Sequence, residues 1–331
     1  MFLRFASRPL GGGAACGPAS SAPLSSWWRL VRGGLLGTAL SNYFLGYALE
    51  AGTDLRLSLT FWIVGVAVAL LYAFGMGLND LCDLEQDRTL HPTRPLPSGR
   101  ISPRSAAFVL ALFGVAALLL GVLAGPQPAF AVGHLCAWIL AYNAGAKNHE
   151  FLGAISMGAV RASLVLLGSN VARASISDTL PVSPFATTSA WIAVGGYVAL
   201  VTWLSMAEDD ATTARSRTRH VALTTWVVTV ACGIVVLQHS GLAGRPRIEI
   251  ILAWLPVLTW TLFYTRRPLL DCPARTSQST YRALLGLFLL DLAILVSYDL
   301  PSAALVPLAL GAGHWLALLK RIPATIAKVR Q

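Results

Sequence analysis

The chain has 331 residues, of which 55% are hydrophobic and only 12% are charged, and its mean hydropathy is +0.64. Because this exceeds what a soluble domain needs to fill its core, a soluble globular protein is excluded. The net charge of +10 is explained by membrane topology and contact with anionic lipid, and gives no evidence for a nucleic-acid partner. The five cysteines form no CxxC or histidine-rich pair, so neither zinc nor a disulfide framework is indicated.

The first 28 residues differ in composition from the rest. They contain Arg4 and Arg8, many Ser, Ala and Gly residues, and no acid, which is typical of a targeting or disordered segment. They lack the apolar stretch of a cleaved secretory signal, so the first long helix after them is expected to cross the membrane. The sequence is therefore divided into a basic N-terminal segment, residues 1–28, and an integral membrane domain, residues 29–331.

Apolar runs of near-bilayer length make up most of the second part. They lie near residues 34–52, 58–78, 105–124, 128–143, 151–169, 188–206, 220–238, 249–265, 281–297 and 302–319. They predict an all-α fold, a polytopic transmembrane helical bundle of nine or ten spans. The count is ten if the last run crosses the membrane, and nine if it lies along the lipid interface.

Lysine and arginine predict the orientation of this bundle, because cytoplasmic loops retain them. With the N-terminus inside and ten crossings, most of the 25 lysines and arginines fall in inside segments. This orientation places the acidic sequence at residues 79–87 on the cytoplasmic side. A bacterial cytoplasmic (inner) membrane is expected, or an organelle membrane if the chain is eukaryotic.

Three oxygen-bearing side chains at the end of the second run are spaced four residues apart. Asn79, Asp83 and Asp87 would stack along one face of a continuous helix, with their oxygens near a single point. Mg²⁺ prefers such ligands, and is typically held by one or two carboxylates together with substrate phosphates. Arginines suited to bidentate contact with phosphate follow the motif; they are Arg88, Arg94 and Arg100. The alternative is a solvated helix end whose acids are balanced by these arginines.

The same stretch carries a family resemblance. Residues 79–87, running into Arg-Pro-Leu-Pro-Ser-Gly-Arg-Ile-Ser at 94–102, resemble the first aspartate-rich motif of the UbiA superfamily of intramembrane prenyltransferases. Further likeness occurs at Tyr-Asn-Ala-Gly-Ala-Lys, residues 142–147, and at residues 153–162. The resemblance extends over most of residues 30–215, and its details are similar to the EboC-like branch.

The resemblance implies a Mg²⁺-dependent transfer of a prenyl group from an isoprenoid diphosphate to a lipophilic acceptor, aromatic or alcohol, within the membrane. It implies that residues 29–331 form a prenyltransferase-like domain around a central cavity, and that this cavity opens toward the membrane lipid. Asp83, Asp87 and Lys147 would be catalytic, with Asn79 as a further metal ligand. Expected substrate contacts are Asn42, Arg94, Arg100, Tyr142, Arg161 and Arg215, and other possible wall residues are Tyr72, Phe74 and Trp203.

The family pattern also calls for a second aspartate-rich motif near the cytoplasmic end of the sixth span. Here Glu208, Asp209 and Asp210 are consecutive, so on a helix they fan out by about 100° each and cannot share one site. One of them, with Ser205 or Thr212, could hold a second metal through water. Glu208 and Asp209 are the candidate ligands, and Glu208 is preferred because its spacing from Ser205 resembles the EboC-like pattern. The alternative is a polar loop between helices.

Ionisable residues inside a membrane are costly, and therefore suggest function. Arg161 lies within the fifth run and could reach a diphosphate or pair with an acid from another helix. Asp291, within the ninth run, is its candidate partner, although a purely structural ion pair is an equal alternative. Asn42 in the first span could face the substrate cavity or join helices to one another.

Three other classes of membrane protein are alternatives to a prenyltransferase. A transporter would explain many spans, but no second copy of the pattern at residues 79–102 occurs. A CDP-alcohol phosphotransferase would need an Asp-Gly-x-x-Ala-Arg pattern, which is missing. A UbiA-fold protein that binds a lipid phosphate and acts in export or assembly is the remaining alternative, because the second motif is irregular.

Overall fold

The computed structural model describes five segments of the chain: residues 24–53, 55–176, 185–206, 248–270 and 276–315, together with the isolated positions 229 and 233. Within these segments all regular structure is helical. The predicted run at 220–238 falls almost wholly outside them, and the run at 302–319 is described only to residue 315, with helix over 305–315.

Helices account for every predicted run that the described segments contain. Their bounds are α1 Leu24–Leu30, η2 Gly33–Leu35, α2 Leu36–Ala51, α3 Leu59–Cys82, α4 Leu84–Leu90, α5 Pro103–Ala124, α6 Pro126–Ala144, η3 Ala146–Asn148, α7 Glu150–Ser175, α8 Ala186–Met206, α10 Ile248–Leu270 and α11 Thr276–Ser297. Two of the helix starts are visible in the sequence, since Ser58 caps α3 and Ser102 caps α5, each by accepting a hydrogen bond from the backbone N–H three residues on.

Three of these helices are long and apolar enough to cross a membrane on length and composition alone. They are α3, α5 and α7, while α10 contributes a shorter apolar stretch, Ile248–Phe263. The outer face of α5 exposes Phe108, Leu119 and Val122, as expected of a helix surrounded by lipid. The all-α membrane fold is therefore confirmed, but a total of nine or ten spans is not.

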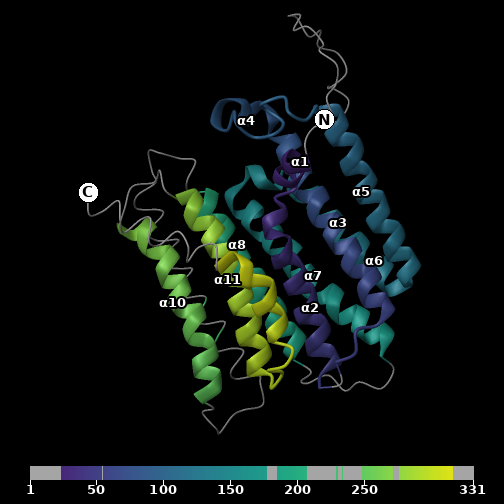
Figure 1. The fold of residues 1–331 in the computed structure, drawn as a ribbon, viewed down its shortest axis with the longest axis vertical. Helices are drawn as coiled ribbons and strands as arrows, with labels where there is room; N and C mark the ends of the chain where they lie inside the picture. The colour runs from purple at the N-terminus through teal and green to yellow at the C-terminus, as the bar shows by residue number, and fades with distance from the viewer. Residues whose placement is uncertain are drawn as a thin grey trace, which may run out of the picture.

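The long helices lie side by side as one bundle (Figure 1). Along the bundle, α5 packs on α3 and α6, α6 packs on α7, α7 packs on α2 and α8, and α11 joins α2 and α8 to α10. The short helix α4 lies across one end of this bundle. That end holds the C-terminal ends of α3 and α6 and the start of α7, so the acidic motif and Lys147 meet there.

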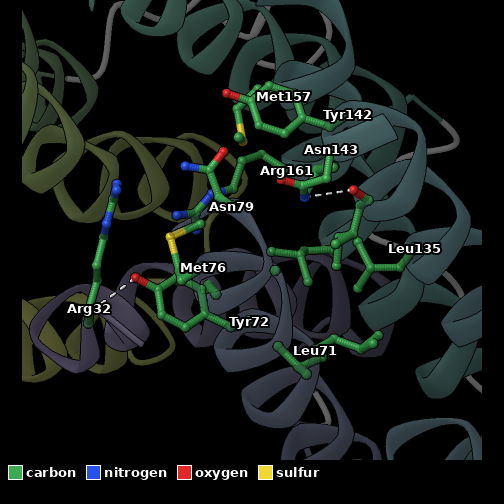
Figure 2. Close-up of a pocket in the computed structure, with 16 residues that line it drawn as sticks. Arg32, Leu71, Tyr72, Met76, Asn79, Leu135, Tyr142, Asn143, Met157 and Arg161 are labelled. Atoms are coloured by element: carbon green, nitrogen blue, oxygen red, sulfur yellow. Dashed lines mark hydrogen bonds between the residues drawn. The ribbon is translucent and has the colours of Figure 1, made fainter. Parts of the chain in front are cut away.

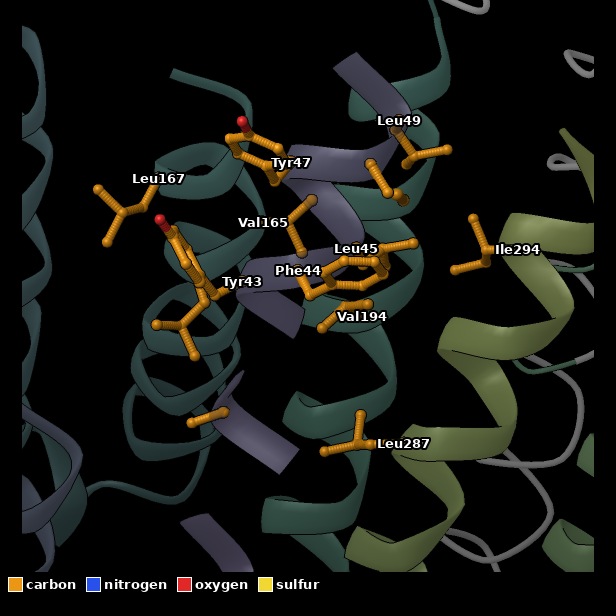
Figure 3. Packing of buried hydrophobic residues seen from close by; sticks show 14 of the residues in the cluster. Tyr43, Phe44, Leu45, Tyr47, Leu49, Val165, Leu167, Val194, Leu287 and Ile294 are labelled. Atoms are coloured by element: carbon orange, nitrogen blue, oxygen red, sulfur yellow. The ribbon is translucent and has the colours of Figure 1, made fainter. Parts of the chain in front are cut away.

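The contact between α2 and α7 is the closest in the bundle core. A Cβ atom on Gly46 would overlap the backbone of Val165, and one on Gly168 would overlap the backbone of Tyr43. Only glycine allows the two backbones to approach this closely. Figure 3 shows the apolar side chains packed around this crossing, among them Phe44 and Val194.

A small second core joins the N-terminal helix to the acidic end of the bundle. Leu30 of α1 packs with Leu96, Ile101 and Ala106, and Trp27 covers the cluster. Helix α1 begins at Leu24, so residues 24–28 are helical although the sequence assigns them to a targeting or disordered segment. The reason is this burial, which the composition of residues 1–28 does not reveal.

Candidate functional site

The acidic motif lies at a bend rather than on one straight helix. Helix α3 ends at Cys82, and Asp83 follows with φ −92° and ψ 6° before α4 begins at Leu84. The backbone N–H groups of Asp83 and Asp87 still donate to the carbonyls of Asn79 and Asp83. The backbone hydrogen bonds between residues four apart are thus kept through the motif, but the bend sends the side chains of the motif in two directions.

Lys147 gathers the first two side chains of the motif. Its Nζ donates to Asp83 Oδ1 at 2.5 Å and to Asn79 Oδ1 at 3.3 Å. Gly145 makes this possible, because its φ of 153° lets the chain leave α6 and turn into η3, which carries the lysine. The two oxygens expected to bind a cation therefore face one cationic atom.

The third side chain of the motif is held by a different cation. Arg94 Nη1 donates to both carboxylate oxygens of Asp87, at 2.8 and 2.6 Å, and lies 3.8 Å from Asp80 Oδ1. Asp80 also accepts a hydrogen bond from Arg32 Nη2 at 3.2 Å. The expectation that Asp87 shares a point with Asn79 and Asp83 is not what the structure shows, because this ion pair turns its carboxylate toward Arg94.

A cavity of about 90 Å³ opens beneath this cluster, between α3, α6 and α7 (Figure 2). Arg32, Asn79, Tyr142 and Asn143 line it near the acidic end. Apolar side chains make up most of the remaining wall; they are Ala39, Val68, Leu71, Met76, Leu135, Ile139, Met157, Val160 and Leu164. The site thus combines a charged entrance with an apolar interior.

Arg161 is the unusual residue of this cavity. It is only 6% exposed, and its Nη1 atom has no hydrogen-bond partner among the described residues. Its guanidinium lies over the ring of Tyr72, 5.9 Å from the ring centroid, and the Tyr72 hydroxyl donates to the carbonyl of Arg32 at 3.1 Å. A buried unpaired cation costs free energy unless a ligand completes it.

Asn143 supplies a second incomplete group in the same cavity. Its Nδ2 donates to the Ile139 carbonyl at 2.9 Å, whereas its Oδ1 is buried without a partner in the described part of the chain. Two residues that line the cavity, Arg161 and Asn143, thus each carry a buried polar atom without a partner among the described residues.

Asn42 and Asp291 lie in a network of their own. Asp291 accepts hydrogen bonds from Ser41 Oγ at 2.5 Å and from Asn42 Nδ2 at 2.9 and 3.0 Å. Asn42 is fully buried and is absent from the cavity wall, so the alternative that it joins helices describes it better. Asp291 makes its hydrogen bonds to α2; it interacts electrostatically with Arg161, as expected, but the two side chains form no direct ion pair.

The remaining predicted residues separate into three groups. Tyr72 and Tyr142 line the cavity, while Phe74 and Trp203 pack against the core. Arg100 is exposed and donates to the Thr93 carbonyl and the Ser98 hydroxyl. Glu208, Asp209 and Arg215 lie outside the described residues.

Sequence reasoning missed Asp80, Arg32 and Asn143. Asp80 is 3% exposed, but it lies outside the four-residue spacing that defines the motif. Arg32 has a left-handed backbone, with φ 47°, and the sequence distinguishes it only as one of the basic residues that predict the orientation of the bundle. The position of Arg32 at the start of the first span, on the same side as the acids, was the available signal.

Oxygen donors suit Mg²⁺ here, although they are not arranged as a complete site. No three His, Cys, Asp or Glu side chains converge on a metal position in the segments described. Asn79 and Asp83 do converge on the Lys147 ammonium, so their oxygens already surround a cation. One or two carboxylates with substrate phosphates are sufficient for Mg²⁺. The carboxylate and amide oxygens present are therefore suitable ligands for that ion.

The family of the chain follows from comparison with known proteins. A model of the UbiA prenyltransferase family matches residues 39–270, well over half of the chain. The chain therefore belongs to the UbiA prenyltransferase family and is an integral membrane protein. The closer resemblance to the EboC-like branch stays a prediction.

Individual relatives match shorter stretches. Digeranylgeranylglyceryl phosphate synthase of Methanococcoides burtonii is 29% identical over 164 residues, covering 45% of this chain and 55% of the relative. Protoheme IX farnesyltransferase of Geobacter sulfurreducens is 36% identical over 108 residues, covering 32% and 39%. The chain thus matches about half the length, or less, of these curated relatives.

A solved structure supports the fold over a longer range. A UbiA homologue from Archaeoglobus fulgidus, bound to GPP and Mg²⁺, has a TM-score of 0.60 and 18% identity, covering 84% of this chain and 99% of the homologue. At this identity the likeness establishes the fold. It agrees with the helical bundle described above.

Proposed function

We propose that this protein transfers a prenyl group from an isoprenoid diphosphate to a lipophilic acceptor within the membrane. One observation carries the proposal: the buried Arg161 lines a largely apolar cavity together with Asn79, the first residue of the acidic motif, which accepts a hydrogen bond from Lys147. A ligand with a charged head and an apolar body suits both parts. An isoprenoid diphosphate, the kind of ligand bound by the Archaeoglobus homologue, has that form.

Mg²⁺ is the proposed cofactor, with Asn79, Asp83 and Asp87 as its ligands. When bound, it would neutralise negative charge on the diphosphate as the leaving group departs. Glu208 and Asp209 stay the predicted ligands of a second ion, with Arg215 beside them as a predicted diphosphate contact. Their contribution would be tested by measuring diphosphate release, as described below, after each of these residues is replaced.

The cations of the chain would hold the diphosphate head. Lys147 and Arg94 each bind one carboxylate of the motif, and each can transfer its donors to phosphate oxygens when those carboxylates engage the metal. Arg161 brings a free donor from deeper in the cavity. A donor held beside a departing anion stabilises its charge, and the removal of one such donor typically costs about 3–4 kcal/mol.

The cavity wall would protect the reactive prenyl cation from water. Tyr72 and Tyr142 present aromatic surface to the cavity, and the side chains below them are aliphatic. Such a wall excludes the solvent that would otherwise hydrolyse the intermediate. The acceptor is proposed only as a lipophilic aromatic compound or alcohol that enters from the membrane.

The acidic end of the bundle is proposed to face the cytoplasm. The support is the distribution of lysine and arginine along the chain, because cytoplasmic loops retain basic residues. Soluble diphosphates and Mg²⁺ would then reach the entrance directly.

Release of diphosphate by detergent-purified protein tests this function. Dimethylallyl, geranyl, farnesyl and geranylgeranyl diphosphates are supplied with and without Mg²⁺, and with a membrane lipid extract as the source of acceptor. We expect Mg²⁺-dependent release that falls about 10²–10³-fold in Asp83→Ala. The matched control is Glu85→Ala, because Glu85 is an exposed acid two residues away that pairs only with Arg88 on the surface among its described contacts.

The outcomes separate the candidate functions. Release that disappears in the Asp83 variant and persists in the Glu85 variant supports transfer, and the prenylated product is then identified by mass. Folded protein that releases no diphosphate from any donor would contradict the proposal and favour a lipid-phosphate binding role.

A further inference from the structure

We infer that Asp291 is the counter-charge of Arg161 and limits how tightly Arg161 holds a phosphate anion. This role rests on the proposed function, in which Arg161 binds the diphosphate. Asp291 is absent from the cavity wall, so it would act on a ligand only through Arg161 and is not a catalytic residue.

Arg161 and Asp291 are buried opposite charges on two helices that share a neighbour. Arg161 lies on α7 and is 6% exposed, whereas Asp291 lies on α11 and is fully buried. Both helices contact α2, and Figure 3 shows Val165 of α7 and Ile294 of α11 around Leu45 of α2. The two charges act electrostatically on each other, and such an interaction is strong in the protein interior because little water screens it.

The packing of α2 on α7 brings Asn42 to the level of Arg161. Two contacts between these helices, four residues apart, each join positions that are 119 residues apart in the chain; they are Gly46 with Val165 and Glu50 with Ser169. A constant separation means that the two helices run in the same direction. Asn42 and Arg161 have this same separation and come one turn earlier, so they lie at one level of the bundle. Because Asn42 also binds Asp291, it lies between the two charges.

Hydrogen bonds fix the carboxylate of Asp291 and, with it, the amide of Asn42. Ser41 Oγ donates to Asp291 Oδ2 at 2.5 Å, and Asn42 Nδ2 donates to Oδ2 at 2.9 Å and to Oδ1 at 3.0 Å. Both carboxylate oxygens thus accept, as suits the ionised form, and these bonds do not require Arg161. Since Nδ2 of Asn42 faces the carboxylate, its Oδ1 is left without a partner among the described residues, as is Nη1 of Arg161.

This arrangement opposes the charge of Arg161 without occupying the Nη1 atom. A direct ion pair would use that donor, whereas a carboxylate held behind Asn42 leaves it available to a ligand. The same carboxylate lowers the positive potential that a phosphate anion meets at Arg161. The weaker hold favours release of inorganic diphosphate after transfer, and product release limits kcat in many enzymes.

Calorimetry with inorganic diphosphate and Mg²⁺ tests this role on the detergent-purified protein. Asp291→Asn removes the charge and keeps the shape of the side chain. Ser41→Ala is one control, because it removes a hydrogen bond from the same network and no charge. Glu50→Gln is the other: Glu50 is a buried carboxylate of α2, but it pairs with Arg173 and lies about 12 Å beyond Asn42 along the helix axis.

We expect Asp291→Asn to bind inorganic diphosphate about tenfold more tightly than the wild type, because the anion then meets an unopposed cation. Ser41→Ala and Glu50→Gln should bind it with wild-type affinity. In donor turnover, KM and kcat of Asp291→Asn should both fall, because diphosphate leaves more slowly. The ligand-free variant should have a lower Tm than the wild type, and diphosphate should raise that Tm by more than it raises the Tm of the wild type.

Equal or weaker affinity in Asp291→Asn would overturn the inference, and so would the same gain in affinity in either control. A lower Tm with unchanged affinity would show that Asp291 is only structural. Folded wild-type and variant proteins that both fail to bind diphosphate would also contradict the role. Asp291→Ser is a second uncharged variant should Asp291→Asn fail to fold.

Failure of this role and failure of the proposed function give different results. Turnover of isoprenoid diphosphates, with equal affinity of the wild type and Asp291→Asn for inorganic diphosphate, removes the role and leaves prenyl transfer supported. Tighter binding by Asp291→Asn, with no turnover of any donor by the wild type, supports the role and contradicts transfer.

Discussion

At the scale of single residues, Arg161 carries the most information. A guanidinium buried with an unused donor destabilises the folded state, because desolvation of the charge is not offset by a direct ion pair. Tyr72 contributes a ring contact at 5.9 Å, and Asp291 interacts with the charge at longer range. A residue of this kind is better explained by ligand binding than by stability.

Replacing Arg161 should therefore separate stability from activity. In Arg161→Met we expect a Tm that is unchanged or higher, because an apolar chain of similar length replaces an unpaired charge, and a loss of diphosphate release of about 10²-fold. Thermal unfolding in detergent and the release assay measure the two quantities. A Tm that falls along with the activity would show that Arg161 is structural.

Arg173, on the same helix, provides the contrasting control. Its Nε and Nη2 donate to Glu50 at 2.7 and 3.0 Å, and Glu50 is buried. Arg173→Met should lower stability by about 1–3 kcal/mol by leaving that carboxylate short of donors, and should leave diphosphate release of the folded protein unchanged. The cost is limited because Arg173 itself is more than half exposed.

The sequence revealed only part of this residue-scale detail. Asn79, Asp83 and Lys147 lie in contact, which is compatible with the single site that the resemblance implies for them. The contacts of Asp80 with Arg32, and the network of Ser41 and Asn42 around Asp291, depend on helices far apart in the sequence. No spacing rule within one helix could have predicted them.

At the scale of helices, the apolar runs were the dependable signal. The runs at 58–78, 105–124 and 151–169 correspond to α3, α5 and α7, because bilayer thickness fixes both run length and helix length. The break at Asp83 was not visible, since no proline or glycine occurs between Asn79 and Asp87. At that break Asp83 pairs with Lys147 and Asp87 pairs with Arg94 in a different direction. Local helix propensity does not encode these ion pairs.

The crossing of α2 and α7 gives a test at this scale. Gly168→Ala should destabilise the protein by about 1–3 kcal/mol, because the new Cβ would overlap the backbone of Tyr43 and force the helices apart. Gly133→Ala on α6 is the control, since nothing lies within 4 Å of its added Cβ and alanine favours helix by up to about 1 kcal/mol. Thermal unfolding measures both, and equal Tm values for the two variants would contradict the close crossing.

At the scale of the whole molecule, the bundle separates a charged end from an apolar body. Family, fold class and membrane location could be predicted from composition and the first motif. The number of spans could not, because several runs fall below the length or hydropathy that defines a span by itself. Their stability in the membrane depends on neighbouring helices.

The predicted orientation can be tested with Cys82, which is exposed at the acidic end, whereas Cys136 is buried. In a variant that keeps Cys82 and has serine at the other four cysteine positions, a membrane-impermeant maleimide should label inside-out vesicles and not right-side-out ones. Geranyl diphosphate with Mg²⁺ should slow the labelling. Reaction only from the opposite side would reverse the proposed topology.

The cluster at the entrance also bears on how a product would leave. Asp80, Asp83 and Asp87 face Arg32, Lys147 and Arg94, so the carboxylates and cations of this cluster balance one another in charge. A charged head group would therefore bind by replacing the carboxylates as partners of these cations, and not by entering a site with an excess of positive charge. After reaction, the carboxylates would compete with inorganic diphosphate for the same cations. The acidic residues that recruit the donor would thus also help to expel what remains of it, which would keep product inhibition weak.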